Sequence, residues 1–81
     1  MITSDQIRAA RALLKWSADD LADAASVGIA TIRRFETSEG IPSGHVRILE
    51  AIKSTLEQAG VQFIGTPDDE PGVKLVKSRK A

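Results

Sequence analysis

The chain has 81 residues, of which 42% are hydrophobic and 27% are charged, and its eleven basic and eleven acidic side chains give a formal net charge of zero. Because it contains no cysteine, it forms no disulfide and offers no thiolate, which favours the reducing cytoplasm as its compartment. A single histidine leaves no metal cluster, and neither a signal peptide nor a membrane-spanning apolar run is visible, so we expect a soluble, cytoplasmic protein without a cofactor.

The first segment, "TSDQIRAARALLKW", has the periodicity of a helix. Thr3 is a suitable N-cap residue, and Gln6 follows it at the spacing of a capping box. The apolar residues that recur at helical spacing, and that we expect to face the core, are Ile7, Ala10, Leu13 and Leu14.

A second, shorter helix is predicted in "SADDLADAA". Ser17 and Asp20 form another capping box, and the early aspartates suit the positive end of a helix dipole. Its apolar face consists of small or medium-sized residues, namely Leu21, Ala22 and Ala25.

The next two helices follow closely. Gly28 can cap or turn the chain before a third helix, in which Ile32 and Phe35 point inward, and Gly40 and Pro42 end it. Ser43 then starts the longest helix, which stops at Gly60 and turns Leu49, Ile52 and Leu56 to one side.

In the C-terminal part, the spacing of the apolar residues changes from that of a helix to that of a strand. Val61–Ile64 and Val73–Val76 alternate apolar and polar residues, and we expect two antiparallel strands joined by an exposed loop. A bare two-stranded hairpin is marginal in water, so it must pack on the helices, pair with a second chain or fray. Residues 61–76 are therefore a candidate dimerisation element, and we expect residues 77–81 to form a flexible basic tail.

The spacing across residues 18–37 is that of two helices joined by a turn of about 3–4 residues, which sets them at roughly 90–120°. Ala22 is small because the two helices cross there at close range. With "LADAASVGIATIRRFE" at its centre, the segment 3–59 resembles the phage-repressor-like helix-turn-helix proteins of the Cro/C1 or XRE type. Ser26 departs from that pattern, because the turn usually has glycine there.

The resemblance implies a mainly α fold: a four-helix, lambda-repressor-like bundle in residues 1–60, followed by the hairpin. It also implies an ion pair between Arg11 and Glu36 that ties the first helix to the third. The third helix, around residues 29–38, would then enter the major groove of double-stranded DNA. Under this resemblance, the DNA-binding residues are Ser17, Ile29, Ala30, Thr31, Arg33, Arg34, Thr37 and Ser43.

The function that these features favour is a transcriptional regulator, a repressor acting as a homodimer. We favour the hairpin as its dimer contact, because it otherwise lacks support, over the fourth helix. The alternative is a protein-interaction module, such as an antitoxin or phage adaptor, that keeps the fold without specific DNA binding; zero net charge and the three aspartates of residues 16–27 favour it. Arg33 and Arg34 would then form a solvated face. An enzyme is poorly supported, since no catalytic or phosphate-binding motif is present.

Overall fold

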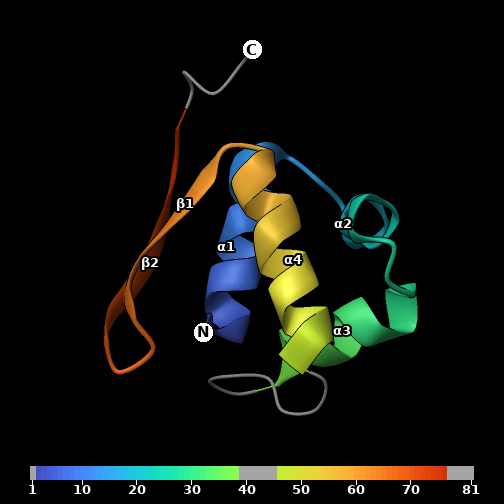
Figure 1. Cartoon of the computed structure of the whole chain (residues 1–81), viewed down its shortest axis with the longest axis horizontal. Helices are drawn as coiled ribbons and strands as arrows, with labels where there is room; N and C mark the ends of the chain where they lie inside the picture. The colour runs from blue at the N-terminus through green and yellow to red at the C-terminus, as the bar shows by residue number, and fades with distance from the viewer. Residues whose placement is uncertain (1, 39–45, 77–81) are drawn as a thin grey trace.

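A computed structural model describes residues 2–38 and 46–76. Four helices are followed by one antiparallel hairpin, which confirms the predicted fold class (Figure 1). The elements are α1 (Ser4–Leu14), α2 (Ala18–Ala25), α3 (Ile29–Thr37), α4 (Val46–Gln58), β1 (Val61–Thr66) and β2 (Asp69–Leu75). The third helix thus has the expected position, whereas the predicted start of the fourth, at Ser43, lies outside the described residues.

Both predicted capping boxes are present. The Gln6 N–H donates to Thr3 Oγ1 at 3.0 Å and the Asp20 N–H donates to Ser17 Oγ at 3.0 Å, while each N3 side chain accepts from the N-cap N–H. Both helices end on a left-handed residue, Lys15 (φ 60°) after α1 and Ser26 (φ 58°) after α2. Local sequence therefore determines where α1 and α2 begin and end.

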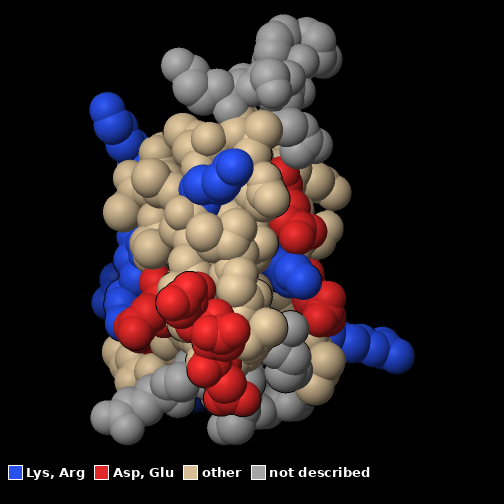
Figure 2. All heavy atoms as spheres, turned by 90° about the vertical axis from the view of Figure 1, so that its left-hand side faces the viewer, with Lys and Arg blue, Asp and Glu red and all other residues tan. Residues whose placement is uncertain are grey.

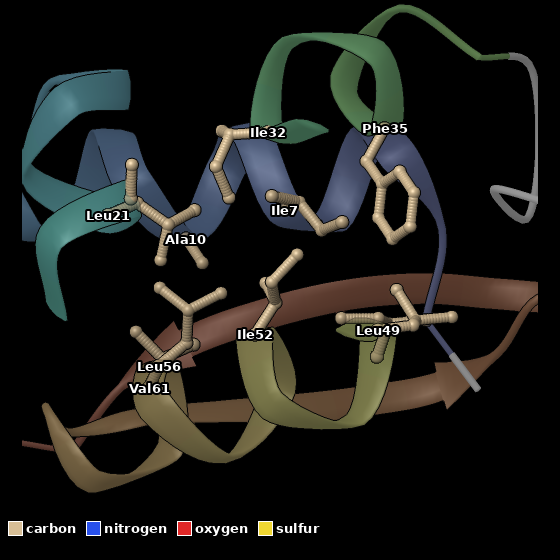
Figure 3. Close-up of a cluster of buried hydrophobic side chains, with 11 residues drawn as sticks. Ile7, Ala10, Leu21, Ile32, Phe35, Leu49, Ile52, Leu56 and Val61 are labelled. Carbon is tan, nitrogen blue, oxygen red and sulfur yellow. The ribbon is translucent and has the colours of Figure 1, made fainter. Parts of the chain in front are cut away.

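The hydrophobic core gathers side chains from all four helices and from β1 (Figure 3). Most residues predicted to face it are buried, including Ile32 and Phe35 of α3, at 0% and 1% exposure. Leu13 is an error in that prediction, since its side chain is 39% exposed. It lies near the end of α1, where no described residue of another element covers it completely. The buried apolar residues are Ile2, Ile7, Ala10, Leu21, Ala22, Ile32, Phe35, Leu49, Ile52, Leu56 and Val61.

The hairpin differs from the expected one in its loop. Instead of a long exposed connection, the strands extend to the pair Thr66–Asp69, so that only two residues form the turn. Gly65 has φ 74°, and the register shifts between Ile64 and Thr66, which makes a β-bulge beside the turn. The stretch "DEPG" is therefore strand rather than loop, because the bulge absorbs its irregular backbone.

The hairpin is supported by the helices, which contradicts the premise on which it was favoured as a dimer contact. Gln6 Nε2 of α1 donates to Ile64 O at 3.2 Å and to Gly72 O at 2.9 Å. Phe63 and Val73 pack against the core. The hairpin thus has a stabilising partner within its own chain, and the need for a second chain does not follow from it.

Candidate nucleic-acid interface

The turn between α2 and α3 is tight. The Val27 N–H reaches back to Ala22 O at 2.9 Å, across the left-handed residue Ser26. Serine at this position accepts the strain that glycine would avoid. Leu21 and Ala22 are buried, so α2 packs closely on the start of α3. The turn orients α3 so that one of its sides remains exposed.

That exposed side of α3 lies opposite its buried side. Ile32, Phe35 and Glu36 are buried, whereas Ala30 and Arg34 are exposed. Because a helix turns by 3.6 residues, residues 30, 34 and 37 form one row along the outer surface. The centre of this row is the Arg34 side chain, whose guanidinium carbon lies 5.9 Å from the centroid of the Phe35 ring.

The other predicted contact residues occupy different environments. Arg33 is exposed on one flank of the outward row, and Thr31 is half-buried on the other flank. Ile29 is half-buried and packs against the core, so it contributes to folding as well as to the surface, which the sequence did not indicate. Thr37 is exposed, and its hydroxyl donates to Arg34 O at 3.2 Å. Ser43 lies outside the described residues.

The predicted ion pair between α1 and α3 is present. Arg11 Nε donates to Glu36 Oε2 at 2.7 Å and Arg11 Nη2 donates to Glu36 Oε1 at 2.9 Å, a bidentate arrangement. Arg11 Nη1 also donates to Trp16 O at 2.9 Å. The hydrogen bond to Glu36 raises the pKa of Arg11, and the Coulombic attraction adds to it against the opposing effect of burial. Arg11 thus joins α1 to the last turn of α3 and to Trp16, in the connection between α1 and α2.

Two further residues of α1 hold the end of α3, and the sequence analysis missed both. Ser4 Oγ donates to Phe35 O at 2.6 Å, and Arg8 Nη1 donates to Glu36 O. Carbonyls in the last turn of a helix lack partners within the helix, and these two side chains supply them. Only a three-dimensional arrangement reveals this, because both contacts join residues about 30 positions apart. They position α3 without facing the outward row.

Residues 7–46 match the sequence model of the helix-turn-helix family. The match begins within α1, covers α2 and α3, and ends at the first residue of α4. The chain belongs to the Cro/C1-type helix-turn-helix family. No curated protein matches the chain. As a member of this family, it contains a DNA-binding regulatory domain. In the helix-turn-helix motif of this domain, α2 is the first helix and α3 is the second.

The two helices of the helix-turn-helix motif are capped differently at their N-termini. At α2, the Ser17 hydroxyl accepts from the Asp20 N–H, and the Ser17 N–H donates to Asp20 Oδ2 at 2.8 Å, so both Ser17 groups already have protein partners. At α3, the N-cap is Gly28, which has no side chain to cap the first N–H groups. The Thr31 N–H donates to Gly28 O at 3.1 Å instead, so the candidate donors to an anion such as phosphate at this end are the N–H groups of Ile29 and Ala30.

The charges of the helix-turn-helix motif are mixed. Arg33 and Arg34 are exposed on α3, whereas α2 exposes Asp19, Asp20 and Asp23. The basic side chains of α3 are therefore the main attraction that this motif offers to a phosphate backbone.

The described residues contain no group of three or more potential metal ligands. Among them, too, no helix is both long and apolar enough to cross a bilayer.

Proposed function

We propose that the protein is a sequence-specific DNA-binding transcriptional regulator, a repressor that acts as a homodimer in the cytoplasm. The observation that carries this proposal is the outward row of Ala30, Arg34 and Thr37 on the second helix of the motif, opposite the buried Ile32 and Phe35. A helix anchored on one side and exposed on the other can enter the major groove.

Each side chain of the row suits a different contact. Arg34, and Arg33 beside it, can donate two hydrogen bonds to O6 and N7 of guanine. Ala30 is small enough for the helix to approach the bases closely, and Ala30 and the exposed part of Ile29 can meet thymine methyl groups. Thr31 and Thr37 can bond phosphates or base edges, and Ser17, the N-cap residue of α2, and Ser43 are further proposed phosphate contacts.

A homodimer follows from the small size of this surface. One recognition helix makes few base contacts, whereas two helices about 34–36 Å apart read successive major grooves of a symmetric operator. Joining two modules raises the overall affinity through the effective concentration of the second site. We therefore expect the operator to be an inverted repeat.

The test is a selection of bound sequences from a random duplex pool with the purified protein at moderate salt. Recovery of an inverted repeat with half-sites about one helical turn apart supports the proposed function. A folded protein that enriches no sequence contradicts it. Circular dichroism establishes that the protein in the selection is folded.

Arg34→Ala is expected to weaken binding to the selected operator by about 1–3 kcal/mol and to relax the base preference at one position of each half-site. Fluorescence anisotropy with a labelled operator measures both effects. The matched control is Lys53→Ala on α4, which also removes one positive charge but lies outside the proposed interface. Equal losses in the two variants would indicate a general charge effect rather than base recognition.

The rival function is a protein-interaction module without specific DNA binding. The exposed acidic residues Asp19, Asp20 and Asp23 of α2 favour it, because they repel a phosphate backbone. The salt dependence of binding to duplex DNA distinguishes the two functions. The affinity of a DNA-binding protein for DNA falls steeply as the salt concentration rises, since its binding releases counterions from the phosphates. A protein adaptor shows no binding to duplex DNA above the non-specific level.

A further inference from the structure

Three successive carbonyls in the last turn of α3 accept hydrogen bonds from side chains, and the donors differ in origin. Arg34 O accepts from Thr37 Oγ1 at 3.2 Å and from Ser38 Oγ at 3.0 Å, so its donors belong to the end of α3 itself. Phe35 O and Glu36 O accept instead from two residues of α1. The first pair of donors moves with α3, whereas the second pair ties α3 to another helix.

The donors on α1 are Ser4 and Arg8, which are one helical turn apart and therefore lie on the same side of that helix. Ser4 Oγ donates to Phe35 O at 2.6 Å, and the Arg8 guanidinium donates to Glu36 O. We call these two hydrogen bonds the α1–α3 clamp. The clamp holds the two residues that directly follow Arg34, which is the centre of the outward row.

The Ser4 hydroxyl is not needed to start α1. Thr3 and Gln6 form the capping box there, each accepting a hydrogen bond from the other's backbone N–H. Ser4 is 1% exposed, and burial of a hydroxyl is unfavourable unless the hydroxyl is hydrogen-bonded. The bond to Phe35 O compensates for that burial. A serine at this position is therefore explained by its contact with α3 rather than by the structure of α1.

Apolar packing holds α3 against the other helices but fixes its exact position less well. Ile32 and Phe35 are buried, yet the hydrophobic effect is non-directional, so it opposes small shifts of α3 along and about its axis only weakly. Hydrogen bonds to two successive carbonyls have preferred directions and oppose both movements. Bidentate recognition of a base needs the side chain to be placed within about 0.5 Å and 10–20°. The clamp provides this kind of accuracy.

Neither residue of the clamp is a suitable DNA contact. Ser4 is buried. The Arg8 guanidinium is already bonded to Glu36 O and paired with Asp5. In Figure 2, which views the molecule from the side of the hairpin that packs on α1, acidic side chains gather in the lower part, where Figure 1 places the hairpin tip. Since acidic side chains repel phosphates, this side of the molecule is a poor surface for DNA.

We infer that Ser4 and Arg8 are positioning residues for base recognition, because they fix from α1 the last turn of α3 and with it the placement of Arg34 against a guanine. This inference rests on the proposed function and adds to it two specificity-determining residues that do not touch DNA. Their loss lowers discrimination between sequences. It leaves the general affinity for DNA almost unchanged, because phosphate contacts depend on charge and carry no sequence information.

Fluorescence anisotropy with the selected operator and with an unrelated duplex of the same length tests the inference. The quantity measured is the ratio of the two dissociation constants, which expresses the specificity. In Ser4→Ala, we expect this ratio to fall at least about tenfold, while the affinity for the unrelated duplex stays within about twofold of the wild type. Arg8→Met is a second clamp variant, at a side chain that is 45% exposed and so tolerant of substitution, and the same fall is expected.

Two control variants separate the clamp from the loss of a hydroxyl and from a loss of stability. Ser38→Ala removes a hydroxyl at the same end of α3, but its bond to Arg34 O does not reach α1, and Thr37 donates to the same carbonyl. Ile52→Val removes a methyl group from a buried side chain of α4 and lowers stability without touching the clamp. Both variants are expected to keep the ratio of the wild type. Circular dichroism verifies that all variants are folded.

The double variant Ser4→Ala/Arg34→Ala gives a readout that a purely structural role does not produce. Because Ser4 acts through Arg34, the double variant is expected to have almost the same ratio as Arg34→Ala alone. Ser4→Ala is also expected to relax the base preference at the position that Arg34→Ala relaxes. Additive losses in the double variant overturn the inference, as does a ratio in Ser4→Ala equal to that of Ile52→Val.

The wild-type protein distinguishes this failure from that of the proposed function. A wild type that selects an operator, together with clamp variants that discriminate equally well, overturns the inference and leaves the function intact. A wild type that selects no sequence overturns the function and the inference with it. A wild type that selects an operator, with a lower ratio in both clamp variants and in neither control, supports both.

Discussion

Arg11→Met is expected to lower the free energy of unfolding by about 3–5 kcal/mol. Glu36 is 7% exposed, and its ion pair with Arg11 joins α3 to α1. Removal of the guanidinium leaves that charge buried without its bidentate partner and also breaks the bond to Trp16 O. Since small domains are stable by only about 5–15 kcal/mol, this loss is a large fraction of the total stability. Urea denaturation followed by circular dichroism measures the change.

Arg8→Met is the control for this prediction, because Arg8 is another arginine of α1 with an acidic partner. Its side chain is 45% exposed and its partner Asp5 is 85% exposed, so its ion pair contributes only about 0–1 kcal/mol. Loss of its hydrogen bond to Glu36 O adds about 0.5–1.5 kcal/mol, so the total stays below the loss expected for Arg11→Met. The double variant Arg11→Met/Glu36→Leu is expected to recover most of the lost stability, since it removes both charges. Equal destabilisation by Arg8→Met and Arg11→Met would contradict the special role of the buried pair.

Gly65→Ala is expected to destabilise the hairpin by about 2–5 kcal/mol. Gly65 has φ 74°, and a Cβ there would lie 2.8 Å from Asp69 O and closer still to Glu70 O, both of them backbone atoms that cannot move aside. Either the bulge opens or the two strands separate. Amide hydrogen exchange is expected to show early loss of protection in β1 and β2, while the helices keep theirs.

Gly28→Ala tests whether this effect is specific to the bulge. Gly28 has a β-region backbone, and a Cβ there would meet nothing within 4 Å. Alanine is a poorer N-cap than glycine, so the expected cost is about 1 kcal/mol, without selective loss of hairpin protection. If Gly65→Ala left hydrogen exchange in the hairpin unchanged, the bulge would not depend on glycine at this position.

The starts of the first two helices, and the side of α3 that faces the core, could be predicted from short stretches of sequence. Thr3 with Gln6 and Ser17 with Asp20 each form contacts three residues apart, so the capping boxes depend on nothing distant. The inward direction of Ile32 and Phe35 follows from helical periodicity in the same way. The two-residue hairpin turn could not be predicted like this, because "GTPDDEPG" has the composition of a loop. The bulge that makes it strand depends on pairing with β1.

The candidate site was predicted in part. Arg33 and Arg34 are exposed on α3 as expected, and the pairing of Arg11 with Glu36 is confirmed. Their role in DNA recognition remains a prediction. The environment of Ile29 was not predicted, because its position on α3 is compatible with either face, and only the packing of α3 on its neighbours decides how much of it is covered.

Gln6 illustrates the boundary between what the sequence determined and what the tertiary structure decided. Its Oε1 accepts from the Thr3 N–H, a contact within one helical turn that the sequence by itself determined. Its Nε2 donates to Ile64 O and Gly72 O, 58 and 66 residues away. The helices, their caps and the helix-turn-helix family follow from local patterns, because those interactions join near neighbours. The register of the hairpin and the exposure of Leu13 and Leu75 were decided only by the fold, because they depend on which distant segments cover each other.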